Sequence, residues 1–337
     1  MRLLDYPGVA GLLRMTGALQ VLERLPRKRG LIVLNYHRVG DPAGNPFDDA
    51  TFSATAAAFR AQMSYVKDRF ATPPAATILE SFSRGRFDAP TALVTFDDGY
   101  RDNHTIAFPV LRELNVPACF FVVSGMLDRP RLPWWDGVAY AIKQTQVDRL
   151  ILEYPTRLEF DLRSTARRLI TWRILRAYKD ASSIDDARFF DELGLRTGVV
   201  IDPEQLGRGL FMSWDDAREM AAAGMTIGSH TVTHPVLAAL PEAAQRRELI
   251  ESRDRIGHMV GVSPELFAYP VGGPGAFTEV TKRAAREAGY RAAFCYYGSL
   301  NLPATTDMYA IARLAVEHDQ TPAQFRLRLA TAAIGGR

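Results

Sequence analysis

The sequence predicts an α/β protein whose strands lie parallel in a sheet or a barrel. From residue 31 onward, short apolar runs alternate with helical patterns, as they do in parallel α/β folds. The 337 residues are 47% hydrophobic and 23% charged, which is typical of a globular chain that buries a sizeable core. We find no internal repeat and therefore expect one large domain that carries one insertion.

The expected strands are short apolar runs, and they lie at 31–37, 91–96, 117–123, 225–230, 265–270, 292–297 and 309–316. The expected helices separate these strands and lie at 51–69, 104–115, 241–261 and 277–289. The last helix ends at Gly289, a residue type that commonly terminates helices.

Two segments depart from this alternation. Residues 1–30 are typical of an amphipathic helical segment, and they lack the order and the small-residue cleavage site of a secretory signal. Residues from about 128 to 212 form a longer, Arg-rich helical pattern. We interpret this second segment as an insertion into a domain that covers 31–330, and the longest loop-like stretch is 40–50.

Composition excludes several classes of protein. A net charge of +3 is too small to indicate a nucleic-acid partner. Cys119 and Cys295 both lie in apolar runs, so no disulfide framework is expected. No uncharged run has the length of a membrane span, so we expect a cytoplasmic protein. Contact with a membrane surface stays open, because four basic residues follow the first helical segment: Arg24, Arg27, Lys28 and Arg29.

Paired carboxylates follow the strand at 91–96, in the sequence TFDDGY. Adjacent strand residues point to opposite sides, but a sharp turn at Gly99 can bring Asp97 and Asp98 to the mouth of the sheet. One carboxylate could then bind a metal while the other accepts a proton. The alternative is an ordinary turn in which Asp98 caps the next helix.

Two histidines stand four residues apart in TIGSHTVTHP. In an extended strand His230 and His234 would lie about 13 Å apart, so they can bind one ion only if the chain turns between them. Two imidazoles and one carboxylate, with a position left open for water, form the ligand set of hydrolytic zinc sites. The alternative is a pair of buried histidines packed into a loop.

The order of TFDDGY, SHTVTHP and FAYPVGG resembles the polysaccharide deacetylase family, the NodB-homology carbohydrate esterases. The resemblance covers roughly 31–125 and 210–318. It implies a distorted (β/α) barrel of about seven strands and a divalent metal, usually zinc, that serves to remove acetyl groups from N-acetylated sugars. It also implies that Asp97 is the general base and that Asp98, His230 and His234 are metal ligands, with Thr231 in the Ser/Thr place of the histidine motif.

The third motif departs from the family pattern. In FAYPVGG, Ala268 stands where the family has an arginine that orients the base. Val271 replaces a tyrosine whose backbone N–H helps to bind the oxyanion, and this donor belongs to the main chain and so survives the change. We predict that Arg313, at the end of YAIAR, replaces the lost arginine. The alternative is that Arg313 is a surface or structural residue.

The general acid has two candidates. His318 fits the family's C-terminal Leu-x-His motif poorly, whereas His37 resembles a histidine that a rearranged branch of the family carries near its N-terminus, including enzymes acting on poly-N-acetylglucosamine. We favour His37 and interpret His104 and His258 as exposed helix residues. Ser229 and Thr233 flank the two ligand histidines and are expected to hold the imidazoles in place.

Substrate-binding candidates are Trp134, Trp135 and Asp136 in PWWDG, together with Tyr269. Tryptophan can stack on sugar rings, but paired tryptophans can equally anchor the inserted helices to the barrel. The expected function is hydrolysis of N-acetyl groups on an amino sugar in a polysaccharide, oligosaccharide or glycolipid. Alternatives are a deformylase or other amidase on a lipid-linked sugar, and a carbohydrate-binding homologue that has lost catalysis.

Overall fold

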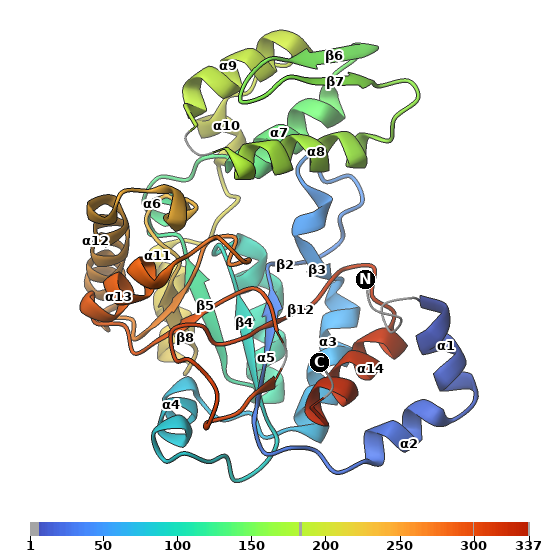
Figure 1. Cartoon of the computed structure of the whole chain (residues 1–337), viewed down its shortest axis with the longest axis vertical. Helices are drawn as coiled ribbons and strands as arrows, with labels where there is room; N and C mark the ends of the chain where they lie inside the picture. The colour runs from blue at the N-terminus through green and yellow to red at the C-terminus, as the bar shows by residue number, and fades with distance from the viewer. Residues whose placement is uncertain (1–6, 182–183, 299, 336–337) are drawn as a thin grey trace. The chain divides into compact units, whose positions relative to one another are not determined.

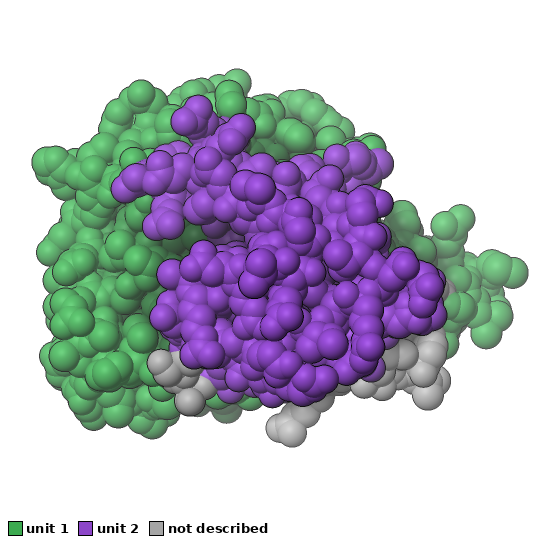
Figure 2. Space-filling view, turned by 90° about the horizontal axis from the view of Figure 1, so that it is seen from above, with its two compact units in different colours: residues 1–41, 52–128, 212–337 green, residues 42–51, 129–211 purple. Residues whose placement is uncertain are grey.

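The computed structural model of the chain describes residues 7–181, 184–298 and 300–335 (Figure 1). The chain forms two compact units (Figure 2). The first unit is built from residues 1–41, 52–128 and 212–337, and the second from residues 42–51 and 129–211.

A single large sheet forms the centre of the first unit. Its strands lie in the order β10-β9-β8-β5-β4-β1-β11, and β12 also pairs with β1. All pairs are parallel except that of β1 with β11. The strands are β1 (Leu31–Tyr36), β4 (Thr91–Phe96), β5 (Ala118–Val122), β8 (Thr226–Ser229), β9 (Leu266–Ala268), β10 (Ala292–Phe294), β11 (Leu300–Asn301) and β12 (Leu314–Ala315). The predicted fold class, a distorted α/β barrel, is confirmed.

One irregular segment joins the two sides of this sheet. Ile311 forms an isolated parallel bridge with Phe294 of β10, and β12 then pairs in parallel with β1. Of the strand that we expected at 309–316, only β12 forms, because the first half of this segment pairs with β10 and the second half pairs with β1. Arg313 lies between the two pairings.

The interior of the barrel is apolar below the carboxyl ends of its strands. Alternate strand residues face one side, and those that share this core are Leu31, Val33, Leu93, Cys119, Phe121, Leu266, Ala268, Ala292, Phe294 and Ile311. Helix α4 (Ala75–Ser83) contributes Ala75, Ile78 and Leu79 to the same cluster. Cys119 and Cys295 are both free and buried.

Helices cover the outside of the sheet. In Figure 1, α11, α12 and α13 lie on one side of the strands, and α11 and α12 contact β8. Helix α14 contacts β1 and α3. These helices are α3 (Ala56–Arg69), α5 (Phe108–Leu114), α11 (Trp214–Ala222), α12 (Glu242–Val260), α13 (Glu279–Glu287) and α14 (Pro322–Ala333), and a short α6 (Ser124–Asp128) follows β5.

The N-terminal segment, predicted as residues 1–30, forms two helices in its described part, and residues 1–6 lie outside the described residues. Helix α1 (Pro7–Met15) and helix α2 (Ala18–Arg24) are separated at Gly17, whose φ of 75° lies in the left-handed region that favours glycine. Ala10 and Leu19 pack against Ala323 and Leu327 of α14. None of the described helices has the length and apolar character that a membrane span requires.

The second unit has its own apolar core. Its elements are α7 (Trp134–Gln144), β6 (Arg149–Leu152), β7 (Leu158–Asp161), α8 (Arg167–Asp180), α9 (Asp186–Thr197) and α10 (Pro203–Gly207). Strands β6 and β7 pair as an antiparallel hairpin, which the purely helical interpretation of this segment missed. Residues 42–51 belong to this unit as well, because the Asp48 N–H donates to Asp136 and Lys143 donates to the carbonyl of Asn45.

Two predicted helices in the first unit also begin differently. The helix predicted at 51–69 is preceded by other structure. The 3₁₀ turn η2 (Asp49–Thr51) and the strand β3 (Phe52–Ala54) come first, and Thr55 is the N-cap of α3. The Thr55 side chain accepts the Ala58 N–H, so α3 starts only at Ala56. The helix expected at 104–115 begins as a π-helix, η3 (Asn103–Ala107), and a short β2 (Arg38–Val39) pairs with β3.

Candidate active site

The candidate site lies where β1, β4, β8 and β9 end, at the carboxyl edge of the parallel sheet. Asp97 and Asp98 directly follow β4 and are 2% and 3% exposed. Asp98 has a φ of 74°, a left-handed conformation that aspartate tolerates better than most residues. This turn lets the two adjacent carboxylates serve different partners.

The chain turns sharply between His230 and His234. Thr231 and His234 have φ values of 69° and 61°, and the two imidazole centroids lie 4.9 Å apart. Both rings are nearly buried, with exposed fractions of 1% and 8%. The turn therefore removes the separation that an extended strand would impose on the pair.

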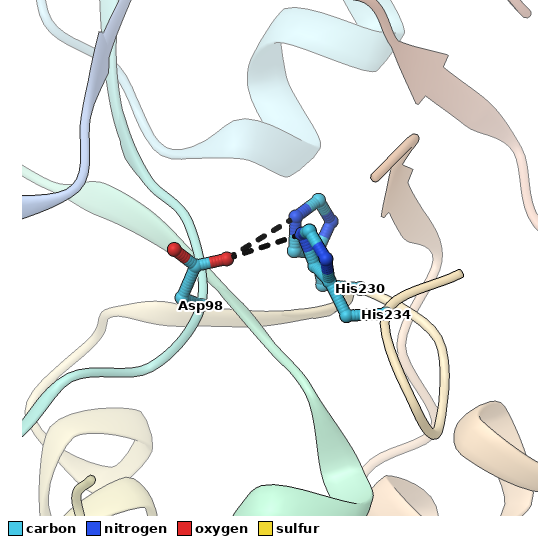
Figure 3. A group of neighbouring side chains, drawn as sticks. All are labelled: Asp98, His230 and His234. Atoms are coloured by element: carbon cyan, nitrogen blue, oxygen red, sulfur yellow. Dashed lines mark ion pairs between the residues drawn. The ribbon is translucent and has the colours of Figure 1, made fainter. Parts of the chain in front are cut away.

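Asp98 completes a triangle with the two histidines. Its Oδ1 lies 3.6 Å from His230 Nε2 and 3.4 Å from His234 Nε2, and Figure 3 shows the carboxylate pointing toward both rings. One ligand atom from each residue lies within 4.8 Å of the other two. Two nitrogens and one oxygen, converging in a buried place, fit a divalent ion such as zinc.

The carbonyl of Ala268 fixes the orientation of His230. His230 Nδ1 lies 2.8 Å from this oxygen, which can only accept, so Nδ1 carries the proton and Nε2 keeps its lone pair. Burial lowers the pKa of His230 below its ordinary value, although Asp97 opposes this shift. A neutral imidazole with a free Nε2 is the form that binds a metal.

Ser229 and Thr233, which flank the two histidines, do not hold the imidazoles as we expected. The Ser229 hydroxyl lies 2.8 Å from that of Ser252, and the Thr233 hydroxyl donates to Glu248. These hydrogen bonds lead away from the imidazoles. The carbonyl of Ala268 therefore takes the part that we assigned to Ser229, since it is this oxygen that orients His230.

Arg313 binds Asp97 through both of its terminal nitrogens. Nη1 donates to Oδ1 at 2.7 Å and Nη2 to Oδ2 at 2.8 Å, and both side chains are almost fully buried. Burial by itself raises the pKa of Asp97, but the charge of Arg313, the neighbouring His230 and the hydrogen bonds from Arg313 hold it well below its ordinary value. Asp97 is therefore a carboxylate at neutral pH.

Asn35 joins the same cluster from β1. Its amide nitrogen donates to Asp97 Oδ2 at 3.3 Å, and its Oδ1 accepts from Arg313 at 3.0 Å. The Arg313 Nε donates to the carbonyl of Cys295 at 2.9 Å, so the guanidinium has partners on several sides. We did not single out Asn35 from the sequence, although an amide inside the apolar strand LIVLNY was a signal that could have found it.

His37 lies beside Asp97 and is partly exposed. Its Nε2 is 4.0 Å from Asp97 Oδ2, and 26% of its side chain is accessible. The backbone on either side is held, because its N–H donates to Ser53 Oγ and its carbonyl accepts from Asn103. An accessible imidazole next to the buried carboxylate can exchange a proton with a bound ligand.

The other histidines lie elsewhere. His318 follows β12 and is half-buried, and His258 is exposed on α12 as expected. His104 lies in the π-helix η3 but is only partly exposed, contrary to our expectation, and its Nε2 lies 3.0 Å from Glu219 of α11.

Val271 follows β9 in a strained turn. Its φ is 62°, which a β-branched residue rarely adopts. Among the described residues its N–H has no hydrogen-bond partner, so this donor is available to a ligand. Four of the five non-glycine residues with positive φ in the described ranges lie at this site: Asp98, Thr231, His234 and Val271. Such strain concentrates at functional sites.

Two of the substrate-binding candidates, Tyr269 and Asp136, are buried by other residues. Tyr269 is 1% exposed, stacks on Phe277 at 4.0 Å and donates its hydroxyl to the carbonyl of Tyr309, so its side chain is a core residue. In the second unit, Asp136 is fully buried and accepts from Asp48. The Tyr269 and Asp136 assignments therefore need correction.

The two tryptophans pack within the second unit. Trp134 stacks on Tyr178 at a centroid distance of 4.2 Å and meets the ring of Trp135 edge-on. Trp135 is 7% exposed. These contacts lie among the inserted helices themselves, α7 and α8, so they bear on neither sugar stacking nor anchoring to the barrel.

Solved structures of deacetylases share this fold. The Streptococcus pyogenes deacetylase PplD in complex with acetate has a TM-score of 0.59 at 15% identity, and the match covers 90% of this chain and 99% of that chain. IcaB from Ammonifex degensii has a TM-score of 0.56 at 21% identity, with 91% of this chain and 98% of that chain covered. At these identities the likeness shows the fold alone.

Sequence relatives match over shorter stretches. A putative polysaccharide deacetylase of Bacillus subtilis, YxkH, is 26% identical over 114 residues, which is 34% of this chain and 38% of the relative. The poly-beta-1,6-N-acetyl-D-glucosamine N-deacetylase of Escherichia coli K12 is 28% identical over 103 residues, 30% of this chain and 15% of the relative. Each match thus spans less than half the length of the relative. The family model for polysaccharide deacetylase matches residues 84–293. The chain therefore belongs to the polysaccharide deacetylase family.

Proposed function

We propose that this protein is a metal-dependent carbohydrate N-deacetylase, which hydrolyses the acetamide of an N-acetylated amino sugar. The observation that carries this proposal is the placement of the Asp97 carboxylate, held by Arg313, next to the triangle of Asp98, His230 and His234. A proton acceptor beside three converging ligand atoms is the arrangement that amide hydrolysis by water requires.

Asp98, His230 and His234 are the residues that would hold the metal, and we propose zinc because two imidazoles and a carboxylate are typical zinc ligands. When bound, zinc would lower the pKa of a water molecule and polarise the acetamide carbonyl. Asp97 accepts the proton of the attacking water, since its lowered pKa keeps the carboxylate ionised at neutral pH. Arg313 and Asn35 hold the Asp97 carboxylate in one orientation.

The remaining chemistry falls to His37 and Val271. The Val271 N–H donates to the oxygen that develops negative charge as water attacks the carbonyl. His37 donates a proton to the leaving nitrogen, so the C–N bond breaks with release of acetate and a free amino sugar. The 4.0 Å between His37 and Asp97 allows one acetamide to lie within reach of both.

The comparisons support the substrate class. The named activity of the E. coli relative is N-deacetylation of poly-N-acetylglucosamine, and that match covers 30% of this chain. We therefore propose an N-acetylated polysaccharide or oligosaccharide as the substrate, and a lipid-linked sugar as the competing choice.

Acetate release from N-acetylglucosamine oligomers tests the proposal, with a formylated sugar as a second substrate. We expect acetate from the oligomers, loss of activity after chelation and recovery on adding zinc. Asp98→Asn and His230→Ala should lose the bound metal, measured on the purified protein. Binding of oligomers without acetate release would indicate a carbohydrate-binding homologue instead.

A further inference from the structure

We propose that Glu248 is the positioning residue that fixes the turn between His230 and His234 and thereby sets the affinity of the metal site. The inference rests on the metal site of the proposed function. It assigns a part in that site to a residue outside all three sequence motifs.

The backbone of the turn between His230 and His234 has an unfavourable conformation. Thr231, a β-branched residue, and His234 both have left-handed φ values, and in this conformation the two imidazole centroids lie 4.9 Å apart. An extended chain would place them about 13 Å apart. The groups of the fold that hold this turn therefore bear on how well the two imidazoles are placed before a metal binds.

Glu248 supplies this restraint from α12. One carboxylate oxygen, Oε2, accepts the N–H groups of Val232 at 2.8 Å and of Thr233 at 3.0 Å. The other oxygen, Oε1, accepts the Thr233 hydroxyl at 2.7 Å. One side chain thus binds both of these backbone donors between the two histidines. An ionised acceptor makes such bonds stronger than neutral ones.

The carbonyl groups of the turn are held separately. The Thr231 carbonyl accepts the Ser124 N–H at 3.1 Å and the Ser252 hydroxyl at 3.0 Å, and the Val232 carbonyl accepts the Gly125 N–H at 3.0 Å. The Thr231 hydroxyl accepts the His234 N–H at 3.0 Å. Within this set, Glu248 is the charged side chain, and a substitution there removes the restraint without altering the ligands.

The test measures zinc affinity by competition with a chelating dye, using the full chain and the Glu248→Gln variant. Glutamine keeps the size of the side chain, but its neutral amide is a weaker acceptor for two N–H groups. We expect zinc affinity to fall by about 10- to 100-fold, the range typical of residues that orient metal ligands. The Glu251→Gln variant is the matched control, since Glu251 lies exposed on the same helix. It should bind zinc like the wild type.

A second readout needs no metal. Amide hydrogen exchange at Val232 and Thr233 in the metal-free protein should be faster in Glu248→Gln than in the wild type or Glu251→Gln. Thr233→Val removes only the hydroxyl contact and should change zinc affinity less than Glu248→Gln does.

The outcomes separate this inference from the proposed function. If the wild type binds zinc and Glu248→Gln binds it equally well, the role of Glu248 is refuted while the metal site stands. Equal exchange rates at Val232 and Thr233 in all variants would refute it too. If the wild type binds no zinc, both proposals fail.

Discussion

Arg313 and Asp97 form a buried, two-pronged ion pair although 216 residues separate them in the sequence. The pair exists because the segment around Arg313 pairs with β10 at Ile311 and with β1 from Leu314, which places Arg313 between these two strands. Asp97 continues the inward-facing alternation of β4 and meets the guanidinium there. The geometry supports the replacement that we predicted for the arginine missing at Ala268.

Removing Arg313 should therefore affect both stability and catalysis. Arg313→Ala leaves a buried carboxylate without its cation, and we expect the free energy of unfolding to fall by about 3–5 kcal/mol. The kcat of acetate release should fall as well, because the orientation of Asp97 is lost. Urea unfolding and steady-state kinetics check the two effects.

Arg291→Ala is the matched control for this substitution. Its ion pair with Glu265 is about half exposed, so the expected loss of stability is about 0–1 kcal/mol. An unchanged kcat in a folded Arg313→Ala protein would contradict the assigned role of Arg313.

Asp97→Asn separates proton transfer from metal binding. The amide introduced by this substitution keeps the shape of the side chain but cannot accept a proton from water. We expect the bound metal to be retained, since Asp98, His230 and His234 are intact, and kcat to fall by about 10²- to 10⁴-fold. Metal content and initial rates are measured on the same preparation. Wild-type turnover would remove Asp97 from the mechanism.

The two candidate acids can be compared directly. His37 lies 4.0 Å from Asp97, whereas no such contact ties His318 to the carboxylate cluster among the described residues. His37→Asn should lower kcat by about 10²- to 10⁴-fold if it is the general acid. His318→Asn should leave kcat close to that of the wild type. A larger loss in His318→Asn would reverse the assignment.

Gly125 gives a steric test of the histidine turn. A Cβ at this residue would lie 2.6 Å from the carbonyl oxygen of Val232, which is backbone and cannot move aside easily. Gly125→Ala should therefore displace the turn and weaken zinc binding. Gly11→Ala is the control, because nothing lies within 4 Å of its added Cβ and alanine favours a helix. Equal zinc affinity in the two variants would show that the turn tolerates the shift.

Glu23 makes the packing of the N-terminal helices depend on pH. It is 4% exposed, and Arg326 of α14 donates to both of its oxygens, at 2.7 and 2.5 Å. These hydrogen bonds lower the pKa of Glu23 in the folded protein, despite burial. Its contribution to stability is therefore present above the unfolded pKa of about 4.3 and is lost as the pH falls below that value.

Unfolding in urea at neutral pH and at about pH 3 measures this contribution. The free energy of unfolding should fall less between the two pH values in Glu23→Gln than in the wild type, since glutamine does not titrate. Equal falls in the two proteins would show that Glu23 is not coupled to folding.

Much of the fold could be predicted because its signals are local. The apolar runs of β1, β4 and β5 and the alternation of strand and helix are properties of short windows. The insertion hairpin of β6 and β7 was missed because its strands are short and partly exposed. The break at Gly17 and the late start of α3 each depend on a single capping residue. The spacing of apolar residues does not locate helix ends to within a residue or two, so these boundaries were not predicted.

The sequence by itself identified most of the residues that we propose for the chemistry at this site. TFDDGY and SHTVTHP place acids and imidazoles at strand ends, and the parallel α/β pattern brings strand ends to one edge. Only the tertiary structure decided how these residues are held. Arg313, Asn35 and Glu248 reach the site from elements far away in the chain, and such contacts depend on strand order and helix packing, which no local pattern encodes. The tertiary structure also placed Tyr269 and Asp136 in buried positions, because the partners that cover them are equally remote in sequence.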